Sequence, residues 1–84
     1  DLSAFGALTE CQRRGIGVPG DIAIGGFGDY EIGSICVPTL TTINARSRSI
    51  GIEAGKLILA INNGAPHASH VTLEPELIVR GSTR

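Results

Sequence analysis

Apolar residues recur at helical spacing near the start of the chain. Their i, i+3, i+4, i+7 series places them on one side of a helix, with polar residues on the other. Two arginines close this stretch and Gly15 follows, the residue type that most easily takes the left-handed conformation at a helix end. The pattern predicts a helix over residues 1–14, with Asp1 or Ser3 as its N-cap. The apolar positions are Ala4, Ala7, Leu8 and Cys11.

A second helical pattern begins at Ser47 and is the clearest in the chain. Its apolar positions follow i, i+4, i+7, i+8, i+11, which forms one continuous stripe. Two asparagines and Gly64 end the pattern, so a helix is predicted over residues 47–62. The stripe consists of Ile50, Ala54, Leu57, Ile58 and Ile61.

Between and after these helices the pattern favours extended chain. Residues 22–24 form a short apolar run, typical of a strand that is buried on both faces. Residues 30–36 are ambiguous and could hold a turn or two of helix, whereas the β-branched stretch 39–43 indicates a second strand. Residues 70–80 alternate in part and contain a proline, which favours an edge strand. Helices and strands therefore alternate, which predicts an α/β fold with parallel strands and right-handed crossovers.

Composition adds that the chain is apolar for its length. Its 84 residues are 42% hydrophobic and only 18% charged, so part of the surface is expected to pack against other protein. The chain contains no methionine, from which we expect a fragment of a larger protein. The net charge of −1 offers no electrostatic basis for binding nucleic acid. No apolar run reaches the roughly 18 residues that a membrane span needs, so no membrane partner is expected.

Cysteines and histidines give little support for a catalytic or metal site. Two cysteines are too few for a disulfide framework and fit a reducing compartment. Cys11 lies on an apolar helix face and is expected to be buried, while the apolar neighbours of Cys36 indicate burial or an interface. His67 and His70 fall in a loop with proline, where solvent exposure is the favoured interpretation. No metal, cofactor or catalytic residue is predicted.

The sequence IGGFGD at residues 24–29 carries three glycines and one acid directly after the apolar run. It lacks the lysine and hydroxyl residue of a phosphate-binding P-loop, and Glu31 stands where a dinucleotide-binding loop would need its last glycine. A structural turn is the simpler interpretation. A ligand site is the alternative, because ligands of open α/β sheets bind at the carboxyl ends of strands.

Four spaced motifs, taken together, resemble the C-terminal part of the effector-binding domain of LacI/GalR-family transcriptional repressors. The resemblance runs along the whole chain and is closest to the gluconate-responsive members. The motifs are D-x-x-A-x-G-A-L (1–8), G-I-x-V-P-x-D-I-A-I-x-G-F (15–27), P-x-L-T-T-I (38–43) and E-L-I-V-R-x-S-T (76–83).

The resemblance implies a fragment of a periplasmic-binding-protein-like fold, in which two α/β subdomains with parallel sheets flanked by helices enclose a cleft. Residues 1 to about 42 would belong to the C-terminal subdomain. Residues from about 43 to 70 would cross to the N-terminal subdomain, and those from about 71 to 84 would return. The family's helix-turn-helix domain is absent from this chain, so any contact with operator DNA would run through that domain.

The resemblance also implies an effector site at the glycine loop. The family commonly places an acid directly after the G-F/Y pair, where this chain has Gly28 after Phe27, and the acid comes one residue later, at Asp29. This departure leads us to expect an anionic effector, such as a sugar acid or sugar phosphate, bound near a free Gly28 backbone N–H. Asp1 resembles the acid at the base of the cleft, which positions the crossing strands or meets ligand hydroxyls.

Two further sets of residues follow from the resemblance. The first would form the hinge between the subdomains: Thr42, Ile43 and Asn44. The second would form the interface of a homodimer, with ordinary core as the alternative: Phe5, Ile32, Ile35 and Cys36.

The expected function is therefore the binding of a sugar or sugar-acid effector, and dimerisation, within a cytoplasmic bacterial repressor that is not an enzyme. One alternative is a secreted periplasmic sugar-binding protein of the same fold. A second alternative is a nucleotide-using enzyme with IGGFGD as its phosphate loop, which the missing lysine disfavours.

Overall fold

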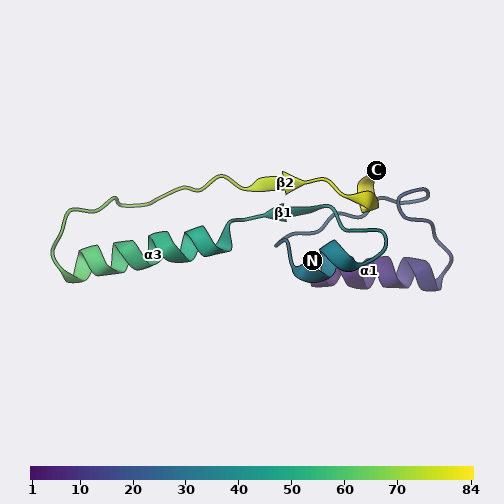
Figure 1. Cartoon of the computed structure of the whole chain (residues 1–84), viewed down its shortest axis with the longest axis horizontal. Helices are drawn as coiled ribbons and strands as arrows, with labels where there is room; N and C mark the ends of the chain where they lie inside the picture. Colours follow the sequence, from purple (N-terminus) through teal and green to yellow (C-terminus); the bar gives the residue numbers. More distant parts are fainter.

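The computed structural model describes all 84 residues, and the chain is elongated, with principal extents of 59 × 18 × 17 Å. Figure 1 shows two groups of elements joined by a two-stranded ribbon, with both termini in the same group. The elements are α1 (Leu2–Arg13), α2 (Glu31–Ile35), β1 (Thr42–Asn44), α3 (Ser47–Asn62), β2 (Glu76–Ile78) and the 3₁₀ turn η1 (Gly81–Thr83).

Helix α1 confirms the first predicted helix. Asp1 occupies the N-cap position without a capping side-chain bond, and Ser3 lies inside the helix, so neither side chain caps it as expected. At the other end Gly15 adopts φ 71°, and the Ile16 N–H donates to the Cys11 carbonyl at 2.8 Å. This is the bonding of a left-handed glycine cap, as the sequence pattern predicts.

Two arginines at the end of α1 both bond to Glu10 on its surface. The guanidinium groups of Arg13 and Arg14 bond to the Glu10 carboxylate and hold the pKa of that carboxyl below its ordinary value. The same contact raises the pKa of Arg13. All three side chains are largely exposed, so these ion pairs contribute little to the fold.

Helix α3 has the predicted bounds, residues 47–62. Gly64 follows with φ 67°, and the Ala65 N–H donates to the Ala60 carbonyl at 2.9 Å, which repeats the cap of α1. None of its residues is buried, not even those of the predicted apolar stripe, in which Ile58 is 59% exposed. No helix in the molecule has both the length and the apolar character that crossing a bilayer requires.

The two crossing strands pair with each other. The strand expected over residues 39–43 begins only at Thr42, as β1. Of the extended segment 70–80, only the residues of β2 pair with another strand. The strands run antiparallel, with the register Thr42↔Ile78, Ile43↔Leu77 and Asn44↔Glu76.

The prediction of a fully buried strand over residues 22–24 is wrong. Ile24 is buried, but Ile22 is 48% exposed and no strand forms there. The parallel pairing that was expected is present only as one bridge between Gly25 and Thr41. A strand is buried on both faces only when neighbouring strands and covering helices are present, and this chain supplies neighbours on one side.

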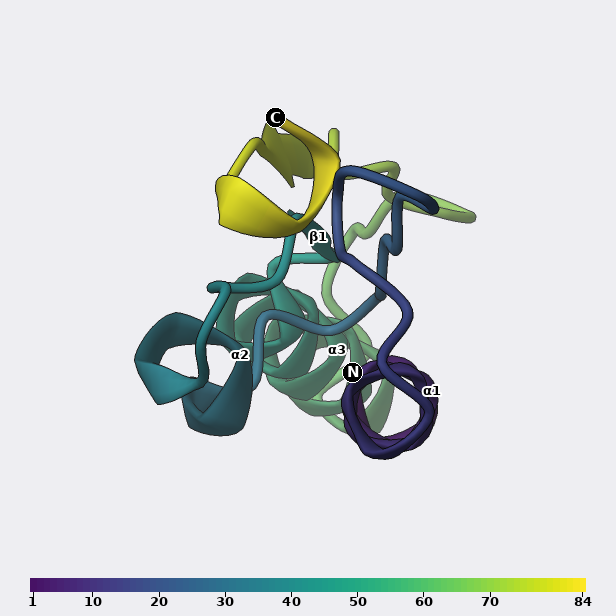
Figure 2. The same cartoon turned by 90° about the vertical axis from the view of Figure 1, so that its right-hand side faces the viewer.

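A small core lies between α1, α2 and the segments beside them. Figure 2 shows α1 and α2 on one side of β1 and η1 on the other. Cys11 and Cys36 are free and only partly buried, so the expected full burial of Cys11 is wrong. The core consists of Ala4, Leu8, Ile24 and Leu40, with Phe5, Cys11, Val18 and Cys36 packed against it.

Candidate functional site

The glycine loop is bonded along β1, where the core group of elements meets the ribbon. The Gly26 N–H donates to the Thr41 carbonyl, and the Gly28 N–H donates to the Ile43 carbonyl, both at 2.8 Å. The expectation that the Gly28 N–H is free for an anion is therefore wrong. The loop continues the parallel pairing that starts at Gly25, and such pairing uses every second N–H group.

The glycines of the loop are required by its geometry. A Cβ on Gly26 would overlap the Asp1 carboxylate and lie 3.1 Å from the Ala4 side chain. Gly28 has φ 115°, and a Cβ there would lie 2.9 Å from the Tyr30 ring. Both positions fit the structural-turn interpretation of the motif, and this turn also brings two carboxylates to the same place.

Asp1 joins three segments of the chain. One carboxylate oxygen accepts a bond from the Thr42 hydroxyl, and the other accepts one from the Tyr30 N–H, each at 2.7 Å. The backbone nitrogen of Asp1 donates to the Phe27 carbonyl at 2.6 Å. Asp1 therefore connects the start of α1 with the loop and with the first crossing strand.

Asp29 has a similar arrangement on the other side of the loop. Its carboxylate accepts bonds from Asn44 Nδ2 at 3.2 Å and from Arg80 Nη2 at 3.0 Å. Its N–H donates to the Thr42 hydroxyl oxygen at 3.1 Å. The side chains of Arg80 and Asp29 are only 20% and 23% exposed. Sequence reasoning did not single out Arg80, although a lone arginine after the apolar residues 77–79 is a signal for a buried acidic partner.

The two carboxylates retain capacity for a ligand. A carboxylate offers about four acceptor positions, and Asp1 and Asp29 each use two of them on side-chain and backbone donors. Phe27 and Tyr30 expose 59% and 53% of their surface on the same loop. The arrangement can accept bonds from hydroxyl groups beside an aromatic surface.

The predicted hinge residues are the three residues of β1. They are paired with β2, so they form half of the ribbon that joins the two ends of the molecule (Figure 1). Thr42 and Asn44 also bond the carboxylates of the loop. The structure thus brings the predicted ligand residues and the predicted hinge residues into direct contact.

The predicted interface residues are not equally accessible. Phe5 and Cys36 pack partly against the core, Ile32 is half-buried, and Ile35 is 66% exposed. Packing on the core fits the alternative for Phe5 and Cys36, whereas Ile35 leaves most of its surface exposed. Their role in a dimer stays a prediction.

The histidines contribute no metal site. His67 and His70 are exposed in the loop after α3. No group of three or more histidine, cysteine or acidic side chains is close enough to hold a metal ion.

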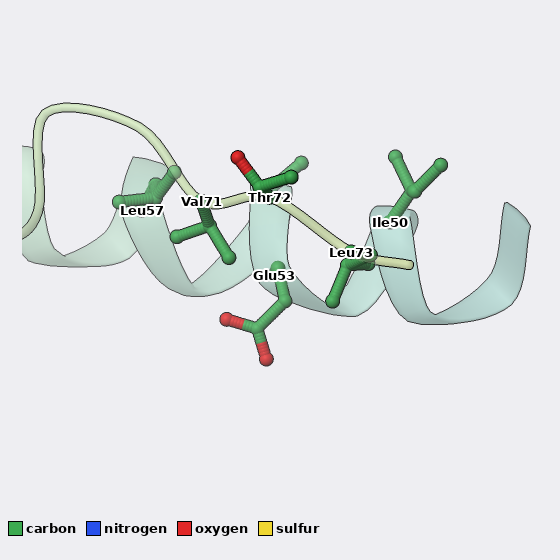
Figure 3. A pocket seen from close by; sticks show the side chains of 7 residues that line it. Ile50, Glu53, Leu57, Val71, Thr72 and Leu73 are labelled. Atoms are coloured by element: carbon green, nitrogen blue, oxygen red, sulfur yellow. The ribbon is translucent and has the colours of Figure 1, made fainter. Parts of the chain in front are cut away.

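An open groove of about 390 Å³ lies between α3 and residues 71–73. Figure 3 shows this segment running along the helix, and Figure 1 places it at the other end of the ribbon from the glycine loop. The groove has few polar groups to orient a ligand, and Glu53 is paired with Lys56 at 3.3 Å. It is lined by Ile50, Glu53, Ala54, Leu57, Val71, Thr72 and Leu73.

Known proteins resemble the chain along its whole length. The transcriptional repressor CytR of Escherichia coli K12 is 42% identical over 85 residues, which cover 100% of this chain and 25% of CytR. The lactose operon repressor of Rhizobium radiobacter is 34% identical over 84 residues, covering 100% of this chain and 74% of that protein. The chain therefore spans about a quarter of the length of CytR.

A solved structure and a family pattern agree with these relatives. The crystal structure of the lac repressor dimer bound to operator and the anti-inducer ONPF matches with a TM-score of 0.90 and 30% identity, covering 99% of this chain and 25% of that one. Residues 1–83 match the family described as the periplasmic binding protein-like domain. The chain therefore belongs to the periplasmic binding protein-like domain family, as a segment of the kind found in LacI-family transcriptional repressors.

Proposed function

We propose that this chain is the effector-binding and dimerisation segment of a cytoplasmic bacterial transcriptional repressor, in which a bound ligand changes the affinity for operator DNA. One observation carries the proposal. The carboxylates of Asp1 and Asp29 on the glycine loop bond directly to Thr42 and Asn44 of the crossing strand β1. A ligand that bonds either carboxylate therefore acts on the ribbon that connects the two ends of the molecule.

The proposed division of the chain follows the ribbon. Residues 1 to about 42 belong to one subdomain, about 43–70 to the other, and about 71–84 return to the first. Operator DNA is proposed to bind through a helix-turn-helix domain elsewhere in the parent protein, in keeping with the net charge of −1 of this chain.

The proposed coupling is a shift between two arrangements of the subdomains, with the hinge at β1. A ligand shifts such an equilibrium only as far as its affinities for the two arrangements differ. A coupling of about 1–3 kcal/mol changes operator affinity by about 5–150-fold. Bonds between the loop and β1 give the effector the means to favour one arrangement.

The proposed effector is a sugar or sugar acid, with gluconate as the first candidate, held by Asp1, Phe27 and Asp29. Two features support an anionic ligand. Gly28 stands where a carboxylate would follow Phe27, and the charge of Asp29 is balanced by Arg80. Less uncompensated negative charge means less repulsion of an anion from a partly desolvated site.

The repressor is favoured over a secreted periplasmic sugar-binding protein of the same fold. CytR and the Rhizobium radiobacter protein are both named as repressors. The proposed role is binding without catalysis, in keeping with relatives that are repressors.

Calorimetry on the full-length parent protein tests the effector class. Gluconate is expected to bind more tightly than glucose, which has nearly the same hydroxyl groups but no carboxylate. Tighter binding of glucose would contradict the anionic proposal while leaving the regulatory one intact.

Fluorescence anisotropy with labelled operator DNA then tests regulation. The sugar that binds is expected to change operator affinity by at least about fivefold. A bound sugar that leaves operator affinity unchanged contradicts the repressor proposal, and the same sugar with an Asp1→Asn variant shows whether the effect runs through this site.

A further inference from the structure

Arg80 forms an ion pair between segments that are distant in the sequence. Four ion pairs are present, and three of them join side chains that are only three or four residues apart in the sequence. The pair between Arg80 and Asp29 instead joins side chains 51 residues apart, each less than a quarter exposed. Arg80 also donates from Nη1 to the Leu40 carbonyl at 3.2 Å. Its guanidinium therefore spans the return segment, the glycine loop and the chain before β1.

Asp29 needs such partners because its backbone is strained. Its φ of 53° lies in the left-handed region, which residues other than glycine seldom adopt. Three bonds hold it there: its N–H to the Thr42 hydroxyl, and its two carboxylate oxygens to Asn44 and Arg80. Asp29 therefore depends on both crossing segments for its conformation.

The bonds continue beyond Asp29 to the second group of elements. Asn44 Oδ1 accepts the N–H of Arg46, the residue before α3, at 2.7 Å. The Arg46 side chain donates to the Glu74 carbonyl of the return segment at 2.7 Å. A continuous series of bonds thus runs from Arg80 through Asp29 and Asn44 to the start of α3.

We propose that Arg80 is a positioning residue of the effector site, which acts through Asp29. It holds the Asp29 carboxylate in the one orientation that keeps the glycine loop, β1 and the start of α3 bonded together before any ligand arrives. The inference rests on the proposed function only in naming the loop as the effector site. A preoriented carboxylate binds a ligand without first losing its conformational freedom.

The physical reason lies in the kind of bond. Arg80 brings a full positive charge to the partly buried Asp29 carboxylate, so its bond is an ion pair as well as a hydrogen bond. The Asn44 amide donates to the same carboxylate but brings no counter-charge. Without Arg80, one bond from an uncharged amide donor and one backbone bond would hold a strained residue, and the carboxylate would have no counter-charge. The loop would then open locally while α1 and the core stay folded.

Hydrogen exchange measured by mass spectrometry on the full-length protein, with no ligand present, tests the inference. The variants are Arg80→Gln, Asp29→Asn and the double variant. Peptides covering residues 26–30 are expected to exchange at least about tenfold faster in Arg80→Gln, while peptides from α1 keep their rates. Because Arg80 acts through Asp29, the double variant is expected to be no faster than the faster single variant.

Two controls complete the design. Arg84→Gln removes the same charge four residues later from an exposed side chain without a side-chain bond, and it is expected to leave the loop unchanged. Arg80→Lys keeps the charge with a single donor group, so it is expected to restore part of the protection even if Arg80→Gln is unstable.

Additive effects in the double variant would overturn the inference, because Arg80 would then act through Leu40 or another group. Equal acceleration in α1 and in the loop would also overturn it, because Arg80 would then support the fold in general. Neither readout involves an effector or DNA. A failure of the repressor proposal in the operator experiment is therefore distinguishable from a failure here.

Discussion

At the scale of single residues, close packing and hydrogen bonding decide what each position of the glycine loop can hold. Gly26 lies against Asp1, and its N–H donates to the carbonyl of Thr41, the residue before β1. Asp29 adopts a conformation more typical of glycine, and its side-chain bonds offset the strain. The loop is thus a tight turn whose acids are held by tertiary bonds, and this combination makes it a candidate binding site.

Replacing Gly26 with alanine is expected to destabilise the full-length protein by about 1–3 kcal/mol, the usual cost of forcing an extra methyl group into a packed site. The new Cβ would collide with the Asp1 carboxylate, which is held by the Thr42 hydroxyl and the Tyr30 N–H. Urea unfolding measures the change. Gly20→Ala is the matched control, because a Cβ there meets nothing within 4 Å, and its stability should change by less than about 0.5 kcal/mol. Equal stability of the Gly26→Ala and Gly20→Ala variants would contradict the close approach of Gly26 to the Asp1 carboxylate.

At the scale of the elements, the helices are defined by local signals and the strands are not. Helices α1 and α3 each end at a glycine with positive φ, at Gly15 and Gly64. Strands β1 and β2 contain three residues each and are ordered by pairing with one another. The ribbon therefore depends on two segments more than thirty residues apart in the sequence.

Gly64→Ala is expected to destabilise the end of α3 by about 1–2 kcal/mol, the cost of the left-handed conformation for a residue with a Cβ. The cost is purely that of the backbone, since a Cβ at Gly64 meets nothing within 4 Å. Urea unfolding of the full-length protein measures it. Asn63→Ala serves as control, because Asn63 has φ −92°, which alanine adopts readily. Asparagine adopts the left-handed conformation more readily than alanine, so Gly64→Asn should lower the free energy of unfolding by less than Gly64→Ala. Equal losses of stability in these two variants would contradict the backbone explanation.

At the scale of the whole molecule, the chain cannot enclose its own apolar surface. Its radius of gyration is 17.8 Å, whereas a compact domain of this length has about 12 Å. Only eight residues are buried, and exposed apolar side chains lie along α3 and beside α2. Surfaces of this kind pack against other protein, which agrees with a chain that spans a quarter of CytR.

Ile35→Asp tests whether the apolar surface at α2 belongs to a dimer. A carboxylate buried in an apolar interface is strongly unfavourable, so the full-length variant is expected to become monomeric at concentrations where the parent is a dimer. Light scattering after size exclusion gives the mass. Ala68→Asp adds the same charge to the exposed loop after α3 and should keep the parent mass. An unchanged dimer in Ile35→Asp would remove Ile35 from the interface.

The sequence by itself determined the two long helices, the turn at the glycine loop and the family. Helix periodicity and the glycine at each helix end are local properties, so α3 has its predicted bounds and α1 differs by one residue at each end. The spaced motifs identified the family because they depend only on the order and spacing of residues along the chain.

Only the tertiary structure decided which donors and acceptors were still free. The Gly28 N–H is used by Ile43, and Asp29 is paired with Arg80 across 51 positions of sequence. Likewise, the exposure of Ile22 depends on which neighbours lie beside its segment. Hydrogen-bond partners and burial arise from segments that are distant in sequence, and no local pattern records them. The loop could therefore be predicted as a turn from its residues, but its place in a network joining both crossing strands could not.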